Sequence, residues 1–165
     1  MRLKLFTLML ATLLAGCGFQ LRGDTALPPE MQATYIDYRG GDGELLRAIA
    51  RALTLNGVEV VQARERATGV LQILSASAPR RVLARDMQGR PQEYEIRVLL
   101  VFRVLDAEGK ILVEQQEVTR QNNLLLDPTD PLTNRSEVDY AVEAMREDAI
   151  WEMLRRISVA TTDGT

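Results

Sequence analysis

Residues 93–105, EYEIRVLLVFRVL, carry the clearest strand pattern in this chain of 165 residues. Successive side chains of a strand point to opposite faces of a sheet. One face of this segment holds only apolar residues, namely Tyr94, Ile96, Val98, Leu100, Phe102 and Val104. The other face, from Glu95 to Leu105, mixes charged and apolar residues. The pattern predicts an antiparallel strand with one face against a core and the other half exposed.

Further strand signals lie on both sides of this segment. Residues 106–109, DAEG, are typical of a hairpin turn, so residues 111–121 are predicted to pair with the long strand. Residues 33–38 and 70–78 are rich in β-branched and aromatic or aliphatic side chains and predict two more strands. Residues 58–61 give a short additional candidate.

Two segments have helical spacing instead. The first covers residues 43–55, with Asp42 as a candidate N-cap and Asn56-Gly57 as a stop signal. The second is predicted to begin at Ser136, with Asp139 as a weak capping-box partner, and to end near residue 158. Its main apolar stripe consists of Val138, Ala141, Val142, Met145, Ala149 and Met153.

These elements predict one α+β domain over residues 31–158. The order is of the type β-α-β-β-β-α, and we expect a small, mostly antiparallel sheet of about four strands with two helices packed on one face. Residues 122–134 are expected to form a loop long enough to suggest a function. Residues 159–165 show no pattern and are expected to be disordered.

The N-terminus has the pattern of a lipoprotein signal. Residues 1–4 carry two positive charges, residues 5–14 are apolar, and Leu14-Ala15-Gly16-Cys17 matches the bacterial lipobox. The apolar run is too short for a membrane-spanning helix. We therefore expect residues 1–16 to be cleaved and Cys17 to carry an S-diacylglyceryl and an N-acyl group. Residues 17–30 would form the lipidated tether.

The alternatives for Cys17 are a chance cysteine after an ordinary signal, or a buried core cysteine. Gly18 stands where an aspartate often retains lipoproteins in the inner membrane, which favours the outer membrane.

Composition narrows the classes of function. The chain has no histidine, which removes serine–histidine and cysteine–histidine catalysis and the commonest metal ligand. Its net charge of −3 becomes −5 once Arg2 and Lys4 leave with the signal, so nucleic acid is a poor partner. We expect no metal, no cofactor besides the lipid, and no enzyme. A glycan hydrolase using Glu93 and Glu95 is the catalytic alternative, although paired carboxylates of this kind are a common surface pattern.

Several short motifs, taken in order, resemble the LptE family of lipopolysaccharide-assembly lipoproteins. They are CGFQLRG at residues 17–23, Leu27-Pro28 before the first strand, LNGV at residues 55–58, and Glu93-Tyr94 opening the long strand. The resemblance covers the mature chain except its tail. It implies a two-helix, four-stranded sandwich on the periplasmic side of the outer membrane. It also implies residence inside the LptD β-barrel, as a plug and assembly aid in inserting lipopolysaccharide into the outer leaflet.

A basic segment fits the ligand that this resemblance implies. The candidate lipopolysaccharide-binding residues are Arg80, Arg81, Arg85, Arg90 and, near the second helix, Arg135. Lipid A carries phosphates, which the planar guanidinium of arginine binds bidentately. The alternative is that these arginines are simply solvated and protect a strand end from aggregation.

The second helix carries more apolar residues than one stripe needs. Ile150, Trp151 and Leu154 fall on other sides, so its C-terminal half is apolar nearly all round and should be buried on more than one side. We interpret these three residues as a partner interface. The alternative is that the tether or tail covers them. A different structural outer-membrane lipoprotein, such as a barrel-assembly protein or a pilotin, would also need this anchor and fold size.

Overall fold

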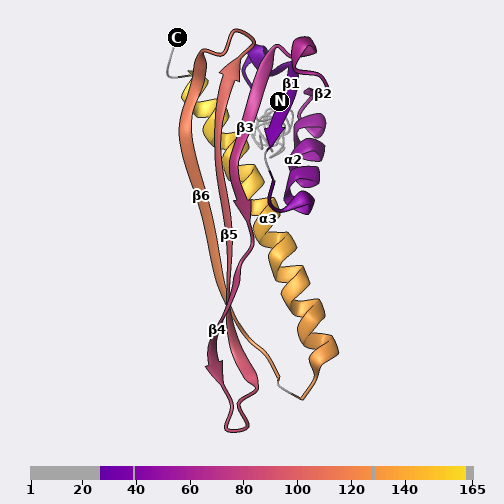
Figure 1. Cartoon of the computed structure of the whole chain (residues 1–165), viewed down its shortest axis with the longest axis vertical. Coiled ribbons are helices and arrows are strands. Elements are labelled where there is room, and N and C mark those ends of the chain that lie inside the picture. The colour runs from indigo at the N-terminus through magenta and orange to yellow at the C-terminus, as the bar shows by residue number, and fades with distance from the viewer. Residues whose placement is uncertain (1–26, 39, 128, 163–165) are drawn as a thin grey trace, which may run out of the picture.

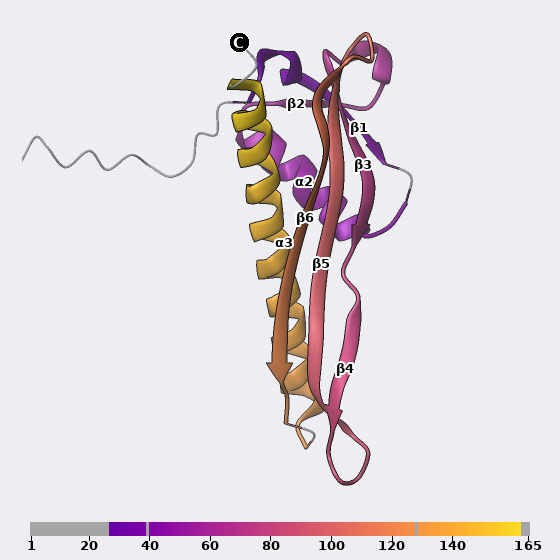
Figure 2. The same ribbon diagram turned by 90° about the vertical axis from the view of Figure 1, so that its left-hand side faces the viewer.

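The computed structural model of the chain describes residues 27–38, 40–127 and 129–162. It has two layers, a long sheet and a pair of helices, and is elongated along the strands (Figures 1 and 2). The segment at 93–105 forms the centre of the longest strand, β5 (Pro91–Asp106). Its apolar face is buried from Ile96 to Val104, beneath the helices. The α+β class and the two helices on one face are therefore confirmed.

The sheet is larger and more mixed than the expected four antiparallel strands. It contains six strands, which are β1 (Ala33–Tyr38), β2 (Glu59–Val61), β3 (Gly69–Ser77), β4 (Arg80–Arg85), β5 and β6 (Ile111–Leu125). β1 runs parallel to both β2 and β3, whereas β3, β4 and β6 all pair antiparallel with β5. The expectations of about four strands and a mostly antiparallel order need this correction.

The sequence pattern did not predict strand β4, which lies in the basic segment and contains Arg80, Arg81 and Arg85. β3 and β4 pair with successive parts of the same side of β5, Ser77 opposite Leu99 and Arg80 opposite Ile96. Pro79 interrupts the two, because proline has no N–H for a ladder. Pairing with the long neighbour outweighs the weak strand propensity of the arginines.

The first helix, α2 (Gly43–Leu55), has the predicted ends. The Asp42 carboxylate accepts the N–H groups of Glu44 at 3.0 Å and Leu45 at 3.2 Å, which satisfies two otherwise unpaired donors. Gly57 after the helix has φ of +80°, a conformation that side chains disfavour. Two short 3-10 turns, η1 (Pro29–Met31) and η2 (Arg64–Arg66), flank β1 and β3.

The second helix, α3 (Pro131–Thr162), is longer than predicted at both ends. Asp130, not Ser136, caps its start, since its carboxylate accepts the Thr133 N–H at 3.1 Å and hydroxyl at 2.7 Å. Because β6 continues to Leu125, the long loop expected at 122–134 shrinks to a few residues. Residues 159–162, expected to be disordered, belong to the helix; residues 163–165 lie outside the described residues.

The C-terminal half of α3 is buried on two sides, as predicted. It packs on the sheet and against α2. Arg146 fastens the two helices, with Nη2 2.6 Å from Asp42 Oδ2 and Nη1 2.7 Å from Glu44 Oε2. Ile150 and Leu154 lie in this core with exposures of 3% and 0%, so placing them on an outer interface was wrong. Both residues belong to the same buried cluster as residues of α2, a helix that contacts α3 and that the apolar stripe of α3 alone does not reveal.

The membrane-anchor predictions fall on residues that the structure does not describe. The signal at 1–16, Cys17 and the tether up to residue 26 lie there. Among the described helices, none is long and apolar enough to cross a membrane. The described residues also contain no cluster of three or more potential metal ligands.

Candidate functional site

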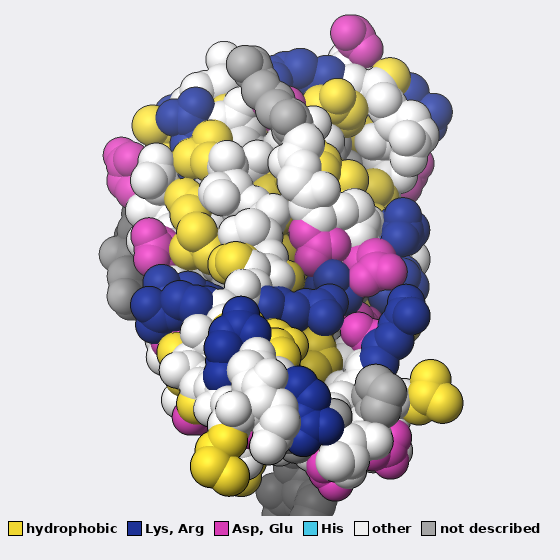
Figure 3. Space-filling model, turned by 60° about the horizontal axis from the view of Figure 1, so that its bottom comes forward, with side chains coloured by type: hydrophobic (Ala, Val, Ile, Leu, Met, Phe, Trp, Pro, Cys, Tyr) yellow, Lys and Arg dark blue, Asp and Glu magenta, His cyan; other side chains and the backbone are white. Residues whose placement is uncertain are grey.

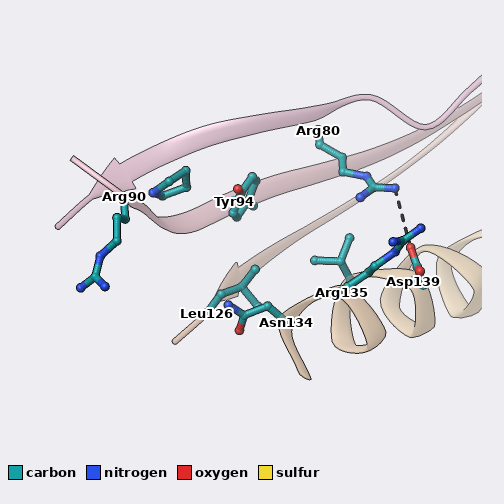
Figure 4. A pocket seen from close by; sticks show the side chains of 9 residues that line it. Arg80, Arg90, Tyr94, Leu126, Asn134, Arg135 and Asp139 are labelled. Carbon is teal, nitrogen blue, oxygen red and sulfur yellow. Dashed lines mark ion pairs between the residues drawn. The ribbon is translucent and has the colours of Figure 1, made fainter. Parts of the chain in front are cut away.

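A pocket of about 570 Å³ opens at the end of the molecule where β4, β5 and the start of α3 meet (Figure 4). Its lining includes Arg80, Arg90, Tyr94, Leu126, Arg135 and Val138. These residues come from three segments far apart in the sequence. The fold therefore brings together three of the five arginines that the sequence analysis singled out.

Strand register explains why Arg80 reaches the pocket. Arg80 lies opposite Ile96, whose side chain is buried beneath the helices, so both point to the helix side of the sheet. There the Arg80 Nη2 lies 3.8 Å from Asp139 Oδ1 on α3, a contact between two half-exposed side chains. Arg135 stands one turn before Asp139 on the same helix (Figure 4).

The other two candidate arginines, Arg81 and Arg85, do not line this pocket. Arg81 lies opposite Glu95 on the outer face of the sheet, and its Nη2 is 3.3 Å from Glu95 Oε2. Arg85 donates to the Gly89 carbonyl at 2.9 Å and so serves the hairpin turn. Glu95 is buried and also accepts Gln121 Nε2 at 2.8 Å, so this carboxylate has a structural role in the outer face.

The hairpin tip holds Arg90 through Asp86. Arg90 Nε lies 2.7 Å from Asp86 Oδ2, and Asp86 Oδ1 accepts the backbone N–H groups of Gln88 at 2.9 Å and Arg90 at 2.8 Å. Partial burial would raise the pKa of Asp86, but these hydrogen bonds outweigh it and lower that pKa below its ordinary value. Asp86 is therefore ionised at neutral pH and holds Arg90 at the edge of the pocket, where its guanidinium points away from Arg80 and Arg135 (Figure 4).

The pocket has an excess of positive charge. Its lining contains three arginines and one acid, Asp139. Arg135 forms no ion pair with any residue in the part of the chain that the structure describes. A guanidinium that is exposed and unpaired is available to an anionic ligand at little cost.

Exposed apolar side chains accompany these cations at the same end. Met87 at the hairpin tip is 98% exposed, and Leu125 and Leu132, before and after the final turn, are also exposed. Figure 3 shows arginine side chains gathered at this end among apolar groups. Leu125 and Leu132 were not predicted as site residues, although they fall in the segment at 122–134 for which a function was suspected. The combination suits a ligand with both phosphates and hydrocarbon.

Of the three residues predicted to form a partner interface, Trp151 alone is exposed at the surface. It lies on the outer side of α3 and is 46% exposed, whereas Ile150 and Leu154 are buried.

Comparison with known proteins gives one consistent result. The model of the family described as "LptE: Lipopolysaccharide-assembly" matches residues 31–157. The LPS-assembly lipoprotein LptE of Pectobacterium atrosepticum is 30% identical, over 95% of this chain and 86% of the relative. That of Yersinia enterocolitica is 28% identical, over 96% and 76%.

Solved structures agree with the sequence matches. Lipoprotein B from Nitrosomonas europaea has a TM-score of 0.71 and 28% identity, over 89% of this chain and 94% of that one. The rare lipoprotein B from Shewanella oneidensis has a TM-score of 0.61 and 25% identity, over 80% and 96%. The family match includes both the hairpin and the helix start that build the pocket.

Proposed function

The chain belongs to the LptE family of lipopolysaccharide-assembly proteins, and we propose that it is an outer-membrane lipoprotein that binds both the LptD β-barrel and lipopolysaccharide. The observation that carries the ligand half of the proposal is that Arg80, Arg90 and Arg135 all line one pocket. In the sequence these arginines are spread over more than fifty positions.

The chemistry of this pocket matches the headgroup and chains of lipid A. Guanidinium groups bind phosphate oxygens through two parallel charge-assisted hydrogen bonds. Arg135 is free to do so directly, whereas Arg80 would exchange its 3.8 Å contact with Asp139 for the ligand. Met87 and Leu132 offer exposed apolar surface to acyl chains. The ligand therefore binds at the tip and is not enclosed by the domain.

The shape of the domain supports a place inside a barrel. A strand as long as β5, 16 residues, extends about 50 Å, compared with about 30 Å for the hydrocarbon of a bilayer. A domain of this length, standing upright in the lumen, extends along the whole thickness of the membrane. We propose that it acts there as a plug and as an assembly aid for the barrel, with the half-exposed Trp151 against the inner wall.

A lipid anchor would determine which end of the domain faces the periplasm. We propose that Cys17 carries the S-diacylglyceryl and N-acyl groups and inserts into the periplasmic leaflet of the outer membrane. The described chain begins at Leu27, at the end of the domain opposite the basic pocket (Figures 1 and 2). An anchor on the periplasmic side then points the pocket toward the outer leaflet, where lipopolysaccharide is delivered.

The test combines a ligand readout with a partner readout. Arg90→Glu with Arg135→Glu should weaken lipopolysaccharide binding by tenfold or more, since each charge-assisted hydrogen bond contributes about 1.5–3 kcal/mol. The matched control is Arg51→Glu with Arg64→Glu, which makes the same charge change on exposed residues of α2 and η2. Both variants should still recover LptD from detergent extracts. Equal loss of binding in the two variants would mean that only net charge matters, and failure of the wild type to recover LptD would refute the barrel partnership.

A further inference from the structure

The free edge of β6 has backbone groups with a defined direction. On β5, the Arg97 N–H donates to the Pro79 carbonyl at 3.1 Å, away from β6. Arg97 and Gln121, and likewise Glu95 and Asn123, are therefore opposite each other without mutual hydrogen bonds. It follows that the N–H and C=O groups of Gln121 and Asn123 point outward from the sheet. The backbone groups of Leu125, two residues further along β6, point outward as well.

Arginine side chains cover the upper part of this edge. Arg156 Nη1 donates to the Glu117 carbonyl at 2.9 Å, and Arg120 Nη1 donates to the Thr119 carbonyl at 3.1 Å. Charged side chains of this kind protect an edge strand from unwanted pairing. No such side chain reaches the outward carbonyls of Gln121, Asn123 and Leu125 from any described residue. The edge of β6 is thus protected at Glu117 and Thr119. It is open at Gln121, Asn123 and Leu125, three positions spaced by about 6.7 Å.

A groove of about 590 Å³ lies directly beside the open positions, between β6 and α3. Its floor includes Leu124 from β6 and Tyr140, Ala141, Ala144 and Met145 from α3. Side chains of an added strand would alternate, and every second one would lie over this floor. Glu137, at the lower end of the groove, forms no ion pair within the described chain, so it favours a basic residue there.

We propose that an extended segment of the barrel partner, one that is not a strand of its closed wall, pairs with β6 at Gln121, Asn123 and Leu125. This β-augmentation rests on the proposed function, because that function supplies the partner. The chemistry of the segment is an alternation of apolar residues facing the groove and polar residues facing outward, with a lysine or arginine near Glu137. The apolar residues fill the groove, and the backbone hydrogen bonds fix the register.

The chain's own tether is too short for this place. Glu30 lies against Gly69, which stands opposite Asp106 on β5. Gln121 is opposite Arg97, nine residues further along β5, or about 30 Å away. The ten residues 17–26 extend about 35 Å at most, which leaves one or two for pairing where five are needed.

Hydrogen exchange at single amides tests the proposal. The mature lipoprotein is measured alone and co-purified with LptD. The amides of Gln121 and Asn123 should exchange at least tenfold more slowly in the complex, whereas those of Asn122 and Leu124, already paired with β5, should be slow in both. If the complex forms and the two outward amides keep their free rate, the augmentation is refuted while the proposed function stands. If these two amides already exchange slowly in the free protein and that protein is a dimer, the edge pairs with a second copy of the chain. That result would also overturn the proposal.

A proline variant separates hydrogen bonding from simple burial. Asn123→Pro removes one outward N–H, leaves the β5–β6 ladder intact and blocks an added strand. Asn123→Ser keeps the N–H and is the matched control. The proline variant should recover several-fold less LptD than the serine variant at equal thermal stability. Equal recovery would overturn the proposal, and if the proline variant does not fold, the exchange comparison decides alone.

Discussion

Trp151 and Leu154 stand three residues apart on α3 and should respond in opposite ways to substitution. Leu154 is fully buried, so Leu154→Ala leaves a cavity in the core that α3 shares with α2 and the sheet and should cost about 2–5 kcal/mol. Trp151 is 46% exposed, so Trp151→Glu removes about 110 Å² of buried surface. At about 25 cal/mol per Å² this is at most ~3 kcal/mol, and the carbons of glutamate and a compact denatured state reduce it to about 1–2 kcal/mol.

The assay is thermal unfolding of the two mature variants in detergent, followed by recovery of LptD. Leu154→Ala should lower Tm by roughly 10 °C, and Trp151→Glu by about 5 °C or less. Recovery of LptD should fall sharply for Trp151→Glu and only in proportion to the folded fraction for Leu154→Ala. If Trp151→Glu unfolds as readily as Leu154→Ala, Trp151 belongs to the protein's own core. If it retains full recovery of LptD, the interface lies elsewhere.

Three further predictions concern the helix pair, acid and the anchor. Arg146→Met should destabilise the domain by about 2–4 kcal/mol in urea unfolding, because it leaves the nearly buried Asp42 carboxylate without its partner. A loss below ~1 kcal/mol would show that this ion pair does not hold the two helices together. Hydrogen bonds from Arg155 and Arg156 lower the pKa of Glu152 to about 2, below its value in the unfolded chain, so its stabilisation should be complete above about pH 4.5 and disappear toward pH 2. Glu152→Gln should flatten the urea-unfolding stability curve in that window, and an unchanged curve would contradict the assignment. Cys17→Ser should leave the signal attached and the protein without acyl groups, and mass spectrometry that finds an unmodified Cys17 in the mature wild type would refute lipidation.

Local signals predicted those parts of the fold that local interactions determine. The alternation at 93–105, the Asp42 cap and the glycine stop after α2 all act over a few residues, and each is found in the structure. β4 could not be predicted this way, because its arginines form a strand only by pairing with the long β5. The parallel pairing of β1 likewise depends on contacts between distant segments.

The candidate site shows the same division. Charge identified Arg80, Arg90 and Arg135, but only the register of β4 separates Arg80, which faces the helices, from Arg81, which faces Glu95. Leu154 was misassigned because a helical wheel shows one helix without its neighbours. It belongs to a core shared with α2 and the sheet, and the position of α2 is not evident from the sequence of α3.

The most direct test of the central claim compares phosphorylated with dephosphorylated lipid A. Affinities are measured for the wild-type mature protein, for Arg90→Glu with Arg135→Glu, and for the charge-matched control Arg51→Glu with Arg64→Glu. If the pocket holds the phosphates, the wild type and the control should prefer phosphorylated lipid A by tenfold or more, and the pocket variant should lose that preference. A preference that is the same in all three proteins would contradict the assignment of this pocket as the lipopolysaccharide site.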